Sequence, residues 1–328
     1  LPPLTVELQL SAVTGLITTG TITDGTTSAD FEGWRKVWLK TAANPAPAQE
    51  FGGYYTLAMD LPAELQGTAA NPGIPQGTGF ASFTVNKVTG TLLVSGKLSD
   101  GTAFTTSTFA GPSGEVLVFK TLYSAKALGS VVGSLEINPE AAGNFDDNTL
   151  AGTLSWWKPA QAGRSYAEGW QPIDLAAVGS LYNPPPAGTP VMGLAAPSLP
   201  GQINAVLELL EANVETAQPA ADRTGFSVSS LNKAVADANN PRKKTLVINA
   251  KTGAISGKFT LSQPHPFGGI PATITRVVAY QGLIVSNGVS QQGWGFFNLP
   301  ELPSSLAEKT TQTRILSGQV KVEAAPAP

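Results

Sequence analysis

Two carboxylates stand at matched positions in this chain. Asp24 and Asp100 are each followed by a glycine, Gly25 and Gly101, in similar stretches of sequence. Two carboxylates about 5–10 Å apart would suit the hydrolysis of a glycosidic bond. An Asp-Gly dipeptide is also a preferred two-residue turn of a β-hairpin, because both residues tolerate positive φ. The turn explains both positions completely, so we expect no catalytic residue and no enzymatic activity.

A polar run raises the question of a metal. Asp146 and Asp147 lie within Gly143–Asn148, and oxygen-rich loops of this kind bind Ca²⁺. The run lacks the alternating carboxylates and the closing Glu of a calcium loop, so we expect a turn and keep calcium binding as the alternative interpretation. The chain has no cysteine and one histidine, His265, which excludes the usual zinc ligand sets. We therefore predict no metal and no cofactor.

The aromatic residues offer binding chemistry. Trp156, Trp157 and Trp170 are the possible ligand or interface aromatics, since exposed indole rings stack on ligands and mark interfaces. Neighbouring residues of a strand point to opposite faces, so Trp156 and Trp157 cannot face the same side. Burial of both rings, one of them under a flanking loop, is the alternative.

The composition limits the class of protein. The 328 residues are 42% hydrophobic and only 13% charged, with a net charge of −3 and no basic stripe, which argues against a nucleic-acid partner. The one basic run, Arg242–Lys244, reads as a solvated turn. No apolar run approaches the roughly 18 residues of a membrane helix. The absence of cysteine is common among exported bacterial proteins, and the start at Leu1 suggests a processed or excised piece of a longer precursor.

A hairpin pattern occurs three times, at 13–25, 88–101 and, more loosely, 251–261. Each copy has a Thr-Gly turn, a second glycine inside the next strand and then alternating polar and apolar residues. Repeated hairpins indicate a repeat-built, all-β protein. The structural turn residues that we assign are Gly15, Asp24, Gly25, Gly90, Asp100, Gly101 and Gly253.

We predict an all-β, antiparallel fold of repeated barrel-like or sandwich-like units built from meandering hairpins. Glycines inside strands mark bulges or bends and favour barrels. Leu4–Leu10, Leu16–Thr23 and Phe31–Leu39 are expected strands, the first of them half-buried. The predicted organisation is a partial first repeat unit at 1–48, a second β unit at 49–183, a Pro-rich linker at 184–190, a third β unit at 191–323 and a disordered tail at 324–328.

Several stretches resemble one group of proteins. They are Gly53–Leu57, Pro75–Val85, Ser95–Thr102, Gly152–Trp156 and Tyr182–Pro185. Together they resemble a family of large, uncharacterised, exported bacterial β-repeat proteins, often found beside immunoglobulin-like modules, over residues 50–322. The resemblance implies export and an extracellular or cell-surface role, and it implies no activity.

The sequence thus favours a non-enzymatic extracellular structural or interaction module of a bacterial surface or secreted assembly. A carbohydrate-binding module that uses exposed Trp residues is the alternative, and an accessory hydrolase is the second. Unpaired edge strands invite association, so we expect the N-terminal strands to bind a protein partner or another copy of the chain. A polysaccharide is a further possible partner.

Overall fold

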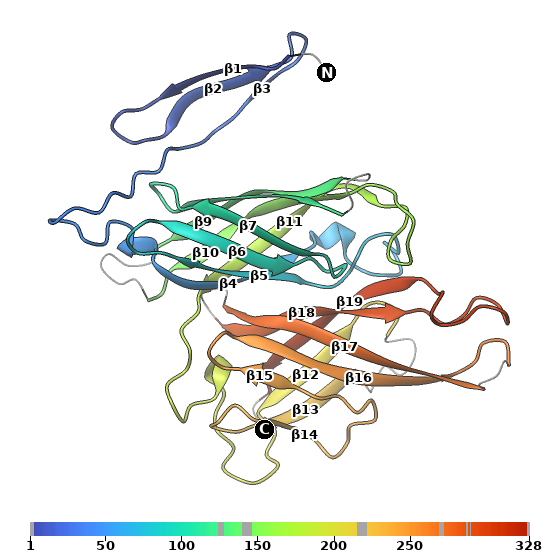
Figure 1. Ribbon diagram of the computed structural model, residues 1–328. Coiled ribbons are helices and arrows are strands. Elements are labelled where there is room, and N and C mark those ends of the chain that lie inside the picture. The colour runs from blue at the N-terminus through green and yellow to red at the C-terminus, as the bar shows by residue number, and fades with distance from the viewer. Residues whose placement is uncertain are drawn as a thin grey trace.

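The computed structural model describes residues 3–123, 128–139, 146–214, 222–268, 272–286, 288 and 290–326. Within these ranges the chain forms three antiparallel sheets, a small N-terminal sheet and two eight-stranded sheets that curl into nearly closed barrels (Figure 1). The predicted all-β antiparallel class is confirmed. Three short 3-10 turns lie between strands, η1 (Gln49–Phe51), η2 (Ala63–Leu65) and η3 (Val191–Gly193).

The first barrel is a meander that returns to its start. Its strands follow the order β7-β6-β5-β4-β11-β10-β9-β8, so strands consecutive in sequence are paired except β7 and β8, and the first strand pairs with the last. At the seam, the Thr106 hydroxyl of β7 donates to the Phe119 carbonyl of β8 at 2.9 Å. The strands are β4 (Gly53–Asp60), β5 (Gly79–Val85), β6 (Thr91–Lys97), β7 (Ala103–Phe109), β8 (Glu115–Leu122), β9 (Gly129–Asn138), β10 (Thr149–Lys158) and β11 (Trp170–Leu181).

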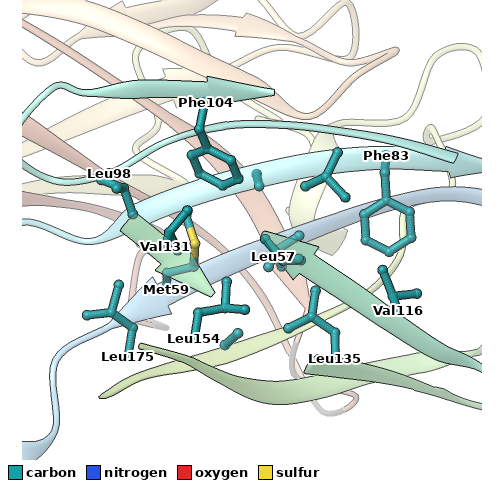
Figure 2. Packing of buried hydrophobic residues seen from close by; sticks show 14 of the residues in the cluster. Leu57, Met59, Phe83, Leu98, Phe104, Val116, Val131, Leu135, Leu154 and Leu175 are labelled. Atoms are coloured by element: carbon teal, nitrogen blue, oxygen red, sulfur yellow. The ribbon is translucent and has the colours of Figure 1, made fainter. Parts of the chain in front are cut away.

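Period-two alternation fills the interior of this barrel. In β6, Leu92 and Val94 are buried while Leu93 between them is exposed. Leu57, Phe83 and other apolar side chains from all around the barrel meet in one cluster (Figure 2). Each fully buried side chain of this kind contributes about 1.5–3 kcal/mol.

The second barrel has the same cyclic order. Its strands follow β14-β13-β12-β19-β18-β17-β16-β15, and again the first pairs with the last. The strands are β12 (Ala205–Leu210), β13 (Arg223–Val228), β14 (Ala234–Ala236), β15 (Val247–Asn249), β16 (Ala254–Pro264), β17 (Thr273–Ser286), β18 (Gln291–Pro300) and β19 (Ile315–Ala324). β19 therefore includes Ala324, and the Ala325 amide donates to the Asn204 carbonyl at 2.9 Å, where the sequence predicted a tail.

The repeated hairpins occupy different steps of the two barrels. The turn at Gly90 joins β5 to β6, the second and third strands of the first barrel. The turn at Gly253 joins β15 to β16, the fourth and fifth strands of the second. The pattern therefore reflects similar turn residues at non-equivalent positions. That the two units are copies of one repeat stays a prediction.

The barrels pack against each other along their outer faces. From β4 and β5, Thr56 donates to the Ile284 carbonyl at 2.9 Å and the Phe80 ring stacks on Phe296 at 5.9 Å. Nearby, Lys97 donates to Gln281 at 2.7 Å. A hydrogen-bonded and stacked contact of this kind fixes β4 and β5 against β17 and β18 (Figure 1).

The N-terminal sheet stands apart from the barrels. It contains β1 (Thr5–Leu10), β2 (Ile17–Thr23) and β3 (Ser28–Asp30), and it extends away from the first barrel (Figure 1). The predicted strand at Phe31–Leu39 is wrong. There the chain leaves the sheet, because Trp38 is anchored in the first barrel by its indole N–H, which donates to the Ala110 carbonyl at 2.6 Å.

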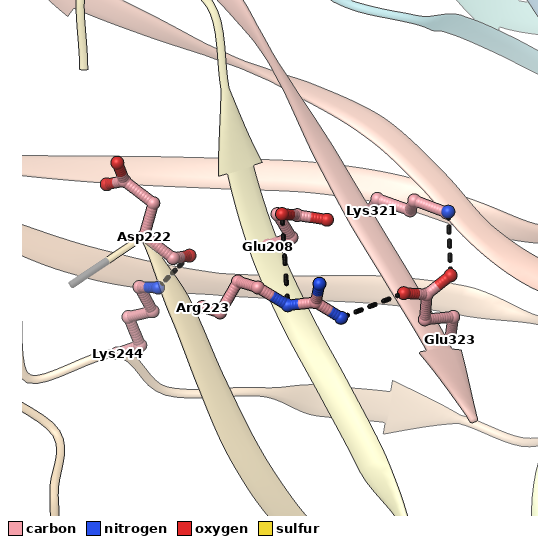
Figure 3. Close-up of polar contacts among 6 residues, drawn as sticks. All are labelled: Glu208, Asp222, Arg223, Lys244, Lys321 and Glu323. Atoms are coloured by element: carbon pink, nitrogen blue, oxygen red, sulfur yellow. Dashed lines mark hydrogen bonds and ion pairs between the residues drawn. The ribbon is translucent and has the colours of Figure 1, made fainter. Parts of the chain in front are cut away.

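The basic run is also a correction, because it is not a solvated turn. Arg242 and Lys244 are 2% and 1% exposed, and only Lys243 between them faces solvent. The Arg242 guanidinium lies 2.6 Å from the Asp222 carboxylate. Figure 3 shows the second contact, in which the Lys244 ammonium donates to the Asp222 carbonyl. Through these buried polar contacts, the run connects the segment beside β16 to the start of β13.

These buried contacts predict a pH dependence of stability. Burial, and then the neighbouring Arg242, lower the pKa of Lys244 to about 7, against about 10.4 in an unfolded chain. Between these pKa values the unfolded chain binds a proton that the native barrel does not, so stability rises with pH across this window. We expect the melting temperature of the full chain to rise from about pH 7 to about pH 10, and Lys244→Met to abolish the rise. Lys243→Met is the matched control and keeps it. A rise that persists in Lys244→Met would contradict the assignment.

Candidate functional site

The structure separates the three predicted aromatics. Trp156 is fully buried and Trp170 is 8% exposed, with their ring centres 4.4 Å apart in the core. Their proposal as surface aromatics is therefore wrong, because both lie on inward-facing strand positions. Trp157 faces outward and keeps 37% of its surface exposed. Among the three, only Trp157 is available to a ligand or partner.

The buried aromatics belong to a polar cluster at one end of the first barrel. The Trp156 indole donates to the Tyr123 hydroxyl at 2.9 Å, and that hydroxyl donates to Asp100 at 3.1 Å. Beside them, the Lys158 ammonium donates to the Tyr166 carbonyl at 2.8 Å and lies 5.4 Å from the Tyr123 ring centre. Burial lowers the pKa of Lys158 and raises the pKa of Tyr123. These contacts give the cluster a structural role at the barrel end.

Asp24 and Asp100, the two matched carboxylates, stabilise the turns in which they lie. Asp24 accepts hydrogen bonds from the Thr27 and Thr26 amides, which hold its pKa below the usual value. Asp100 accepts from the Thr102 amide at 2.8 Å and from its hydroxyl at 2.9 Å. The two lie in different sheets, so they form no catalytic pair. The turn glycines have positive φ, namely 76° at Gly15, 88° at Gly25, 64° at Gly90, 95° at Gly101 and 71° at Gly253.

The calcium candidates lie at the edge of the described chain. Asp146 and Asp147 follow residues 140–145, which lie outside the described ranges, and the Asp146 carbonyl accepts from Asn183 at 2.8 Å. The neighbouring Asn148 is buried, and its amide donates to the Glu50 carbonyl and the Tyr55 hydroxyl. Within the described ranges, no group of three acidic, histidine or cysteine side chains is placed to hold a metal.

One face of the N-terminal sheet is apolar and open. We define this apolar face by Leu4, Val6, Leu8 and Leu10, which alternate along β1 and its approach with Thr5, Glu7 and Gln9. Val6 pairs with Ile22 and Leu8 pairs with Gly20. The sequence predicted a half-buried strand, but every residue of β1 is exposed, Leu8 to 57%. An apolar sheet face that is exposed to water is stabilised when another surface packs on it, so such a face is typical of an interaction site.

At Gly20 the apolar side of the sheet is already covered, by Phe31. The Phe31 ring lies over Gly20, where a built Cβ atom would come within 2.6 Å of the Phe31 carbonyl oxygen. Gly20 is therefore buried while its partner Leu8 is open. The side chains on the other face, such as Thr5, Glu7 and Thr21, are polar. Only one face of this sheet resembles a core surface.

A groove runs from this sheet onto the first barrel. A hollow of about 600 Å³ follows β2 and residues 30–34, and a second of about 870 Å³ crosses the outer faces of β8, β9 and β10. Glu32, Trp34 and Glu115 line both hollows. The barrel side carries exposed apolar residues that face outward, Leu117, Phe119 and Val132, with Phe119 exposed to 60%.

The barrel side of the groove was missed from the sequence, although it carries a signal. Val116–Phe119 reads Val-Leu-Val-Phe, an apolar run rather than an alternation. Such a run is typical of a strand that is covered on both faces. In this structure only the inner face is covered.

The described part of the chain contains no helix that is long and apolar enough to cross a membrane. No protein-family model matches the sequence, and no curated protein matches it. Among solved structures, a double mutant of the vaccine antigen transferrin-binding protein B from Haemophilus parasuis is similar at a TM-score of 0.23 and 12% identity. The match covers 98% of this chain and 65% of that chain, so this chain spans less than two thirds of the other. A TM-score this low supports no inference about function.

The Asp-Gly turn of the first barrel should matter for stability. Gly101 has φ 95°, and a Cβ atom there would lie 2.8 Å from the Asn298 amide nitrogen of the second barrel. We expect Gly101→Val to lower the melting temperature, because positive φ costs a residue with a side chain about 1–2 kcal/mol. Gly163→Val is the control, since that position has open space and no positive φ. Equal melting temperatures of the Gly101→Val and wild-type proteins would show that the turn tolerates side chains.

The acidic turn predicts no dependence on calcium. Because no group of three acidic, histidine or cysteine side chains is placed to hold a metal among the described residues, thermal melts with chelator and with excess Ca²⁺ should overlay. A calcium-dependent increase in melting temperature that disappears in Asp146→Ala would overturn this expectation.

Proposed function

We propose that this protein is a non-enzymatic interaction module that assembles with a second copy of itself through the apolar face of its N-terminal sheet. The observation that carries the proposal is the exposure of Leu4, Val6, Leu8 and Leu10 on one side of β1. In both barrels the matching apolar positions point inward and are buried. These four residues alternate as the core residues of the barrels do, but they are exposed.

A second copy is the occupant that the surface chemistry favours. The apolar face carries no charged side chain, so two such faces can meet without burying an unpaired charge. Two sheets pack about 10 Å apart with interdigitating apolar side chains. A two-fold axis would place the same row on both sides of such an interface, as in most homodimers. The four side chains that define the apolar face are exposed and therefore accessible to a partner.

The biological setting forms part of this proposal. The absence of cysteine is compatible with an oxidising exterior without requiring disulfides. The resemblance of the turn motifs to exported bacterial repeat proteins favours a secreted or cell-surface assembly. Exposed Trp157 keeps polysaccharide binding as a second candidate, because an outward indole can stack on a sugar ring.

Two neighbouring residues on opposite faces test the assembly. In Leu8→Glu a charge enters the apolar face, whereas in Gln9→Glu the same charge enters the polar face one residue later. Light scattering with size-exclusion chromatography on the full chain should give a dimer for wild type and Gln9→Glu, and a monomer for Leu8→Glu. Burying a carboxylate in the interface costs several kcal/mol, enough to shift dissociation by about a thousandfold.

Two outcomes would reject self-assembly. One is a wild-type monomer at every concentration tested. The other is a dimer that Leu8→Glu leaves intact, which would locate the contact elsewhere. Thermal melts of both variants check the barrels, which should be unaffected because β1 pairs within the N-terminal sheet and contributes no residue to either barrel core.

A further inference from the structure

A cleft opens between the two barrels, away from the N-terminal sheet. Its volume is about 350 Å³, within the usual range of small-molecule pockets. The first barrel contributes the end of β4 and the middle of β11, and the second contributes β17 and β18. The side chains that line it include Asp60, Thr78, Val178, Val285, Gln292 and Trp294.

The wall of the cleft combines one aromatic plane with aliphatic side chains. Trp294 lies on the outer face of β18, across from Lys321 of β19 in the ladder. The Lys321 ammonium lies 5.4 Å from the indole centre and pairs with Glu323 at 2.6 Å. These contacts restrain the indole as a platform. Val285 and Val178 add apolar surface from either barrel.

The polar groups of the cleft are held in place across the barrel interface. Asp60 is half-buried and accepts from the Leu61 amide at 3.1 Å and from the Thr78 hydroxyl. Thr78 in turn accepts from the Gln319 amide of β19 at 2.8 Å, which directs its own hydroxyl proton to Asp60. A carboxylate has about four acceptor positions, so Asp60 retains capacity for further donors. Gln292 supplies an amide donor and acceptor on the opposite side.

We propose that this cleft binds a neutral hexopyranose ring, with Trp294 under its C–H face and Asp60 accepting its hydroxyl groups. A sugar ring has this combination of an apolar face and a polar edge, and the wall of the cleft presents both kinds of surface. The carboxylate disfavours acidic sugars by like-charge repulsion. The cleft lies at the junction of two units, where ligand sites commonly form. The site is independent of the N-terminal sheet, so it does not rest on self-assembly.

The test uses four free sugars as probes, glucose, galactose, mannose and N-acetylglucosamine, with the full-length protein. Saturation-transfer NMR at millimolar concentration should detect binding of at least one of them. Trp294→Ala should abolish the signal and Asp60→Asn should weaken affinity about tenfold or more, as expected for a lost charged hydrogen bond. Trp294→Phe, which keeps an aromatic face, should retain measurable binding.

Trp157→Ala is the matched control, because this indole is exposed on β10 and does not line the cleft. Binding that survives Trp294→Ala but disappears in Trp157→Ala would overturn the cleft and assign the sugar to β10. Absence of binding by all four sugars would overturn the proposal itself. Thermal melts of each variant distinguish loss of the binding site from loss of the fold. If Trp294→Ala fails to fold, the two milder variants still test the site: Trp294→Phe should keep measurable binding and Asp60→Asn should weaken it.

Discussion

Closure of the sheets is the constraint on which this structure depends. A strand edge leaves its N–H and C=O groups without partners, and a barrel removes the edge by pairing its first strand with its last. In both eight-stranded sheets the first strand in sequence pairs with the last, β4 with β11 and β12 with β19. The sheet edges that remain, β7 beside β8 and β14 beside β15, are brought together as each sheet curls into a nearly closed barrel. The remaining seam of the second barrel is closed by side chains, with Arg242 and Lys244 reaching Asp222. Buried charge is tolerated there because each cation has an oxygen partner.

The N-terminal sheet shows what happens without closure. Its strands have the same alternation as the barrel strands, yet β1 buries none of its residues. The difference lies in the surroundings rather than in the local pattern, because three strands cannot curl around an interior. Its apolar side is left as a surface for association, which is the basis of the proposed assembly.

Local patterns in the sequence predicted the strands and turns well, and predicted their surroundings poorly. Alternation located β1, β2 and most barrel strands, and the Asp-Gly pairs do form turns at Gly25 and Gly101. The strand predicted at Phe31–Leu39 fails because a distant contact of Trp38 decides the path. Trp170 and the basic run were misplaced for the same reason, since burial of a polar or aromatic residue depends on partners far away in sequence. The cleft at Trp294 joins residues more than two hundred positions apart, so no local signal marks it.

The pairing of first and last strands also determines how each barrel would respond to tension. Tyr55 lies opposite Leu181, and Ala205 lies opposite Ala324, so the chain enters and leaves each barrel at one point. A pull on the two ends would therefore load the ladder bonds one at a time, as in opening a zipper, instead of loading the whole strand in shear. In a tethered assembly, each barrel would yield by peeling at low force, and the contacts between β4, β5 and the second barrel would supply the resistance.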